Sequence, residues 1–244
     1  MIAQLRQLLQ RPAGIDNDPG CQALGVTAID GALGGGFARG ALHEISAAGE
    51  AHLAAAAWFA LAVSSRAVRK STVWIAEDMA LGESGALYGP GLETFWLAPE
   101  RLLTVAAAQR RDLLWAMEEA LRCRAVHVAI GELRHGDIDG VAVRRLSLAA
   151  SESGALALLL RASPPNDAST AATRWIVGAA PSSSPSPPGG GERESCFAVE
   201  LTRNRRGPLG AWTLQWSDED GFVLATPAQP VAAPAADRPH RKIA

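Results

Sequence analysis

Short apolar segments alternate with longer segments of helical periodicity along this chain, between about residues 24 and 226. Buried strands are expected at residues 41–45, 72–76, 102–105, 126–130, 155–160 and 173–177. Helices are expected at residues 51–65, 110–123 and 139–153. This alternation is typical of an α/β domain in which helices cover a largely parallel central sheet.

The last part of this region has a different periodicity. Apolar and polar residues alternate at residues 199–201 and 212–216, on either side of residues 203–210. Strict alternation indicates strands with one buried face, and the short polar connection favours a hairpin. We therefore expect an antiparallel hairpin at one edge of the sheet.

The N-terminal segment is set apart from this region. Ile2, Leu5, Leu8 and Leu9 have the spacing of one apolar helix face, so this helix is a candidate surface for oligomer or partner contacts. Residues 181–195 and the C-terminal tail are rich in Pro, Gly, Ser or Ala and are expected to be disordered. The expected divisions are a helix at 1–13, a linker at 14–23, a core domain at 24–226 and a tail at 227–244.

The composition excludes several classes of protein. Of the 244 residues, 48% are hydrophobic and 20% are charged, which is too apolar for intrinsic disorder. The longest uncharged apolar stretch, residues 51–65, is too short to span a bilayer, and no leader peptide is recognisable. A formal net charge of −2 gives no general basic field. A soluble cytoplasmic protein with no membrane contact is expected.

Metal and covalent chemistry have few candidate residues. Cys21, Cys123 and Cys196 are scattered, and the histidines lack ligand spacing, so no metal site and no disulfide framework is expected. No nucleophile elbow is present. Lys70 and Lys242 are the only lysines among 23 basic residues, so any reaction that needs a lysine has two candidate positions.

A glycine-rich segment carries the most specific signal. Residues 24–45 read LGVTAIDGALGGGFARGALHEI, in which Gly34, Gly35 and Gly36 allow positive φ before a strand that reaches Glu44 and Ile45. The segment resembles the start of the ATPase core of RecA-family recombinases, where a similar phrase leads into the phosphate-binding loop. The resemblance implies a RecA-like core of the P-loop NTPase type.

The loop that follows departs from the family pattern. In the family, glycines, a lysine and a hydroxyl residue bind phosphates and magnesium. Alignment on the Glu-Ile pair places four residues without this chemistry at those positions: Ala47, His52, Leu53 and Ala54. Glu50 adds a negative charge where an anion would bind. The resemblance therefore implies a degenerate phosphate loop.

The expected metal-binding carboxylate is also altered. In the family an apolar strand ends in an aspartate that orients magnesium, whereas the segment at residues 126–130 is followed by Gly131 and Glu132. With both halves of the site changed, we expect no catalytic residue, no cofactor and no ATP hydrolysis. The alternative is a rebuilt, DNA-stimulated ATPase site that uses Glu132 and Arg205.

The predicted hairpin carries a second resemblance. Residues 203–210 read RNRRGPLG and are similar to a basic signature with which family members reach across a subunit boundary to a neighbour's nucleotide. On this match, the candidate residues for a partner or for nucleic acid are Arg203, Asn204, Arg205 and Arg206. Arginine suits both carboxylates and phosphates, and weak, salt-dependent DNA binding is expected. The alternative is a solvated hairpin tip.

Three further phrases narrow the resemblance. These are YGPGL at residues 88–92, LAPERLL at 97–103 and WAMEE at 115–119, which together resemble the ImuA family of bacterial SOS-response proteins, also described as SulA- or RecA-like. The resemblance implies an accessory subunit of the translesion-synthesis mutasome. Its implied partners are an ImuB-type, Y-family-polymerase-like protein, an error-prone replicative-type polymerase and RecA. A regulator of RecA filaments or of cell division is an alternative.

Other prominent residues have ordinary structural interpretations. Most of the tryptophans fall within the expected strands and helices, so we expect them to pack in or near the core. Glu118 and Glu119 are expected on a solvated helix face rather than as paired catalytic carboxylates.

Overall fold

The computed structural model describes residues 20–66, 71–165, 169–182 and 195–225. The N-terminal helix with Ile2, Leu5, Leu8 and Leu9, the C-terminal tail and most of the 181–195 segment lie outside the described residues. The strands are β1 (Cys21–Gln22), β2 (Phe37–Ala38), β3 (Ala41–Ala47), β4 (Ser71–Glu77), β5 (Leu102–Ala107), β6 (Val126–Leu133), β7 (Leu156–Arg161), β8 (Thr173–Ala179), β9 (Cys196–Asn204), β10 (Gly210–Ser217) and β11 (Gly221–Leu224). The helices are α2 (Thr27–Leu33), α3 (Leu53–Ser65), α4 (Asp78–Ser84), α5 (Gly89–Thr94), α6 (Arg110–Arg122) and α7 (Gly140–Ser153), with short 3₁₀ turns at Glu50–His52 and Pro99–Arg101.

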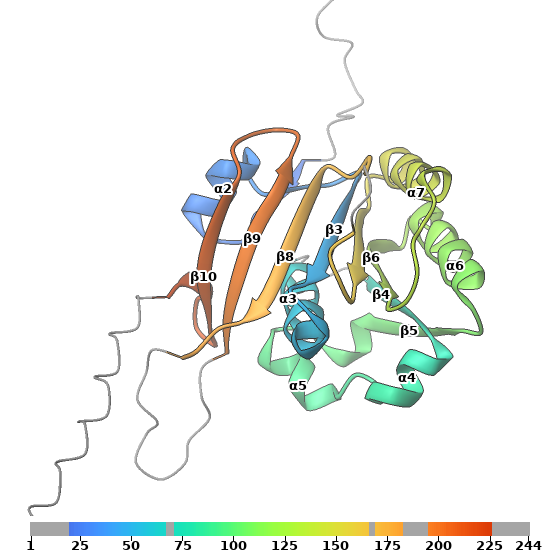
Figure 1. The fold of residues 1–244 in the computed structure, drawn as a ribbon, viewed down its shortest axis with the longest axis horizontal. Helices are drawn as coiled ribbons and strands as arrows, with labels where there is room; N and C mark the ends of the chain where they lie inside the picture. Colours follow the sequence, from blue (N-terminus) through green and yellow to red (C-terminus); the bar gives the residue numbers. More distant parts are fainter. Residues whose placement is uncertain (1–19, 67–70, 166–168, 183–194, 226–244) are drawn as a thin grey trace, which may run out of the picture.

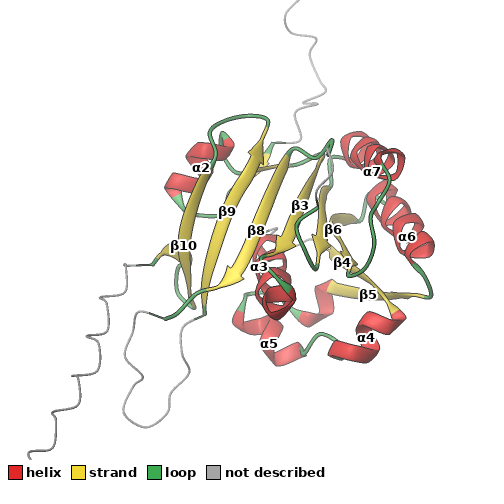
Figure 2. Ribbon diagram, in the orientation of Figure 1, coloured by secondary structure: helices red, strands yellow, loops and turns green. Residues whose placement is uncertain are grey.

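A nine-stranded sheet organises the molecule, in the order β11-β10-β9-β8-β3-β7-β6-β4-β5 (Figures 1 and 2). The six strands from β8 to β5 are parallel to one another, whereas β9, β10 and β11 are antiparallel to their neighbours. β1 and β2 form a separate two-stranded sheet. The expected α/β class, the largely parallel sheet and the antiparallel hairpin at one edge are confirmed.

Two hydrophobic clusters lie on opposite faces of the parallel strands. One contains side chains from α2, α3 and α5 together with Ile45, Ile130 and Trp175 of the sheet. The other contains side chains from α6 and α7 packed on strand residues such as Ile75 and Leu159. Alternate residues of β7 point into alternate clusters, as the two-residue period of a strand requires. The sheet is therefore the middle layer of a three-layer domain.

The glycine run after α2 adopts positive φ values at all three of its residues. Gly34, Gly35 and Gly36 have φ values of 70°, 113° and 120°, which L side chains rarely adopt. A Cβ on Gly36 would lie 2.4 Å from the carbonyl oxygen of Gln22. The run therefore lets the chain turn tightly out of α2 and bring β2 against β1.

Two expectations about individual strands and helices are corrected. The strand expected at residues 126–130 extends to Leu133, so Glu132 lies within β6 rather than after it. Glu118 is buried rather than solvated, because α6 packs against α7 and its carboxylate pairs with Arg122 and Arg145. Glu119 is exposed, as expected, and pairs with Arg122.

The tryptophans divide between core and surface. Trp74, Trp175 and Trp216 are buried, as expected for core packing. Trp115, on the outer side of α6, is 62% exposed, and Trp96 is 39% exposed. Trp115 lines an open groove between α6 and α7, which leaves it largely exposed.

Candidate functional site

The expected phosphate loop connects the end of β3 to the start of α3. Ala47 is the last residue of β3, His52 ends a 3₁₀ turn, and Leu53 and Ala54 open α3. The structure therefore places all four residues where a strand, loop and helix of the P-loop type would put phosphate-binding groups. None of the four residues is a lysine, an arginine, a serine or a threonine.

Internal hydrogen bonds occupy the backbone of this loop. The amide of Ala48 donates to the carbonyl of Val177 at 2.8 Å, and the amide of His52 donates to the carbonyl of Gly49 at 2.9 Å. The imidazole Nδ1 of His52 accepts a hydrogen bond from the amide of Ala179 at 3.1 Å. The loop is thus tied to β8 by the residue that stands in place of a phosphate-loop glycine.

A mostly apolar pocket of about 730 Å³ lies beside the head of α3. Leu53, Ala54, Trp58 and Leu81 line it, together with Glu50, whose charge opposes an anion at this position. Neither Lys70 nor Lys242 lies in the described part of the chain. The described lining residues therefore suit apolar contacts better than a polyphosphate.

Glu132, the alternative metal ligand, has a protein partner in this structure. Its carboxylate accepts a hydrogen bond from Nε of Arg134 at 2.8 Å, and its side chain is only 7% exposed. Arg134 also reaches Ser84 Oγ at 2.7 Å and Glu83 at 3.4 Å. Within the described ranges, no group of three or more His, Cys, Asp or Glu residues is arranged to hold a metal ion. Because the Arg134 guanidinium already pairs with the Glu132 carboxylate, these residues do not fit a magnesium nucleotide.

The arginine turn, residues 203–206 at the end of β9, lies at the opposite end of the parallel strands from the loop before α3. Because β9 runs antiparallel to β8, residues 203–206 lie beside the start of β8 and α2, whereas the loop before α3 follows the end of β3 (Figure 1). Within one molecule, Arg205 and Glu132 therefore lie at opposite ends of the parallel strands. A joint role for them requires a second copy of the chain.

The four residues of this turn have different surroundings. Asn204 Nδ2 donates to the carbonyls of Ala32 and Pro208, and its Oδ1 accepts from the amide of Arg206. Nε of Arg203 contacts the carbonyl of Ala171 at 3.3 Å. Arg205 and Arg206 are exposed, and Arg206 reaches Cys21 Sγ at 3.2 Å. Asn204 builds the turn, while Arg205 and Arg206 present charge to solvent.

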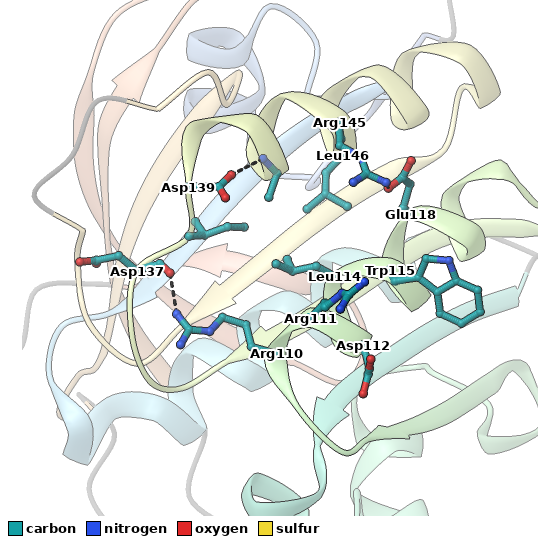
Figure 3. Close-up of a pocket in the computed structure, with 12 residues that line it drawn as sticks. Arg110, Arg111, Asp112, Leu114, Trp115, Glu118, Asp137, Asp139, Arg145 and Leu146 are labelled. Carbon is teal, nitrogen blue, oxygen red and sulfur yellow. Dashed lines mark hydrogen bonds and ion pairs between the residues drawn. The ribbon is translucent and has the colours of Figure 1, made fainter.

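Sequence reasoning missed a groove between the first turns of α6 and α7. It has a volume of about 890 Å³, and Figure 3 shows Arg110, Arg111 and Trp115 of α6 among the residues that line it. Nη1 of Arg110 donates to the carbonyl of Asp137 at 2.6 Å. The signal was present in the sequence as charged residues at the start of both expected helices, but only the packing of the helices brings them together.

The described helices include none that is long and apolar enough to cross a membrane.

Comparisons with known proteins agree with this architecture. No protein-family model matches the chain. Protein ImuA of two strains of Caulobacter vibrioides is 31% identical over 209 residues, which cover 79% of this chain and 82% of that protein. Among solved structures, the RadB recombinase superposes with a TM-score of 0.56 at 15% identity, covering 82% of this chain and 98% of that one.

Proposed function

This chain belongs to the ImuA family and has a RecA-like fold, and on that basis we propose that it is a non-catalytic accessory subunit of a damage-tolerance complex. It acts in the cytoplasm, in SOS-induced translesion synthesis, by contacting an ImuB-type protein. An error-prone replicative-type polymerase and RecA are the further partners. The 31% identity to Protein ImuA supports membership of the family. The partners and the role in translesion synthesis are those that the family resemblance implies.

The arrangement of the loop before α3 is the main support for a non-catalytic role. Leu53 stands at the position of the phosphate-binding lysine, and His52 ties the loop to β8 through the amide of Ala179. Since Arg134 neutralises Glu132, neither the phosphates nor magnesium have their usual protein partners. Partner contacts then remain as the function of the fold.

Copurification tests the proposed partnership. We expect the tagged chain to bring down an ImuB-type protein from cells treated with a DNA-damaging agent. The double variant Arg205→Ala, Arg206→Ala removes exposed charge from the turn and should weaken the association, whereas Arg144→Ala on the exposed side of α7 should leave it unchanged. Absence of an ImuB-type protein from the purified complex would contradict the proposal.

DNA contact through the arginine turn is a secondary part of the proposal. Three guanidinium groups can neutralise only a few phosphates, so binding should be weak and should fall as salt is raised. Fluorescence anisotropy with a single-stranded oligonucleotide measures this. Binding that survives the substitution of Arg203, Arg205 and Arg206 by alanine would assign DNA contact to another surface.

A rebuilt ATPase is the competing enzyme function. It predicts calorimetric ATP binding that is lost in Glu132→Ala, and it requires two copies of the chain because Arg205 lies at the other end of the parallel strands. Our proposal predicts no heat of ATP binding in either protein. For a regulator of RecA filaments or of cell division, the corresponding test is deletion of residues 1–13, which should abolish inhibition if that helix carries it.

A further inference from the structure

Arg161 is a buried cation at the end of β7. Its side chain is 6% exposed and lies on the α6 and α7 face of the sheet, because Leu159, two residues earlier, belongs to that cluster. The loop before α3 and the apolar pocket beside it contact the opposite face. Arg161 is therefore outside the site described above.

The one ion-pair partner found for Arg161 among the described residues neutralises it poorly. Nη2 lies 3.4 Å from Asp137 Oδ1, and the side chain of Asp137 is 92% exposed. Nη1 is buried and has no hydrogen-bond partner. A buried guanidinium loses hydration that a long contact to a solvated carboxylate does not replace. A second anion bound to Arg161 would compensate for the hydration that the guanidinium loses on burial.

A cavity adjoins this guanidinium at the ends of β6 and β7. It has a volume of about 410 Å³, and its lining includes Leu133, Gly136, Asp137 and Ser163 besides Arg161. Arg134 also lines it, but Glu132, Glu83 and Ser84 already contact that side chain. Among the described lining residues, Arg161 alone has a cationic nitrogen without a partner.

We propose that this cavity binds a single oxyanion, the carboxylate or phosphate group of a small molecule, against the Arg161 guanidinium that lines it. Two parallel N–H groups of a guanidinium match the oxygens of either group. A nucleic-acid strand is less suitable, because it needs a row of cations and Asp137 repels a second phosphate. This inference does not depend on the proposed partnership.

The position of Asp137 is compatible with an open cavity mouth. Figure 3 shows its carboxylate directed away from Arg110, whose Nη1 bonds the Asp137 carbonyl instead. The backbone of Asp137 is thus held while its side chain is solvated, so the carboxylate can leave Arg161 when another anion enters. Asp137 is then a competitor of the ligand rather than part of its site.

Thermal unfolding in inorganic phosphate, acetate and chloride at equal ionic strength tests this proposal. An anion at about ten times its Kd raises the melting temperature of a domain of this size by roughly 3–6 °C. We expect phosphate or acetate to raise it above the chloride value, and the anion that does so identifies the preferred group. Asp137→Asn should increase the rise, because it removes the competing carboxylate.

Variants at two arginines separate binding from general salt effects. Arg161→Met should lose the anion-specific rise, whereas Arg144→Met, on the exposed side of α7, should keep it. If Arg161→Met does not fold, Arg161→Lys can be tested instead. It keeps the charge but loses the bidentate geometry of the guanidinium, so the Kd for the anion should rise about tenfold or more. Equal responses of wild type and the Arg161 variant would overturn the proposal. An oligonucleotide that displaces phosphate from wild type would also overturn it, because a nucleic-acid strand would then be the ligand of the cavity.

Discussion

At the scale of single residues, His43 is held as a neutral imidazole inside the core. Its Nε2 donates to the Ala38 carbonyl at 2.9 Å, and its Nδ1 lies 2.7 Å from Thr173 Oγ1. Burial lowers the pKa of His43 to about 4, the bond to Ala38 opposes this, and the charge of Arg206 lowers the pKa further. The fold therefore keeps His43 neutral at pH values at which a solvent-exposed imidazole would already bind a proton.

His43 should make the protein sensitive to acid. The unfolded imidazole binds a proton below about pH 6.5, whereas the folded one does so only near pH 4, so stability falls as the pH drops through this window. The loss is on the order of 3 kcal/mol and levels off below the folded pKa. Urea unfolding at several pH values measures it. His43→Gln should flatten this slope, whereas His135→Gln, at an exposed position, should not.

Asn204 and Arg205 are neighbours with different expected effects. Asn204→Ala removes three hydrogen bonds that hold the turn, so the free energy of unfolding should fall by about 1–3 kcal/mol. Arg205→Ala changes an exposed side chain and should alter it by less than about 0.5 kcal/mol. Denaturant titration compares them, and similar losses in both would show that the turn depends on Arg205 as well.

Single residues differ in how well the sequence predicts them. Leu53 and His52 were located by register alone, because a strand, a loop and a helix follow in fixed order. Arg161 was not found, since an arginine after an apolar run looks like the exposed end of a strand. Its burial depends on how the chain beyond β6 and β7 covers it, which is a contact between distant segments and leaves no local pattern.

At the scale of secondary structure, Gly131 lets α6 approach β6 closely. A Cβ at this position would lie 2.7 Å from Met117 Sδ and 3.4 Å from Leu113 Cδ2. Gly131→Ala should therefore cost about 1–3 kcal/mol, with the flexible Met117 keeping the loss toward the low end. Gly82→Ala, in the open middle of α4, should instead stabilise by about 0.5–1 kcal/mol. Equal melting temperatures of the two variants would contradict the role of Gly131.

The main strands and helices could largely be predicted because each has a local signal. All six expected parallel strands are present, and α7 begins where Asp139 caps it by accepting from the amide of Ala142. The short helices α4 and α5 and the β1 and β2 pair were missed, since two to seven residues give too little periodicity. Their conformations depend on tertiary contacts, such as the close approach at Gly36.

At the scale of the whole molecule, the two proposed sites lie at opposite ends of the parallel strands. The six residues of β7 span about 20 Å, and the arginine turn lies at one end while Arg161 and the loop before α3 lie at the other. Changes at the two ends should therefore act independently. The free energies of unfolding of Arg161→Met and Arg205→Ala should add within about 0.5 kcal/mol in the double variant. A larger coupling would show that the sheet transmits strain between the two ends of its strands.

The hydrogen bond between His52 and Ala179 bears on whether substitutions could make this loop bind phosphate. Leu53→Lys would return an ammonium group to the head of α3, but the amide of His52 would still be bonded to Gly49 and the imidazole to β8. Glu50 and the pair of Glu132 and Arg134 would also have to change. A single substitution therefore leaves the contacts of the other residues in place. We therefore expect that Leu53→Lys alone would not create a phosphate site in this loop.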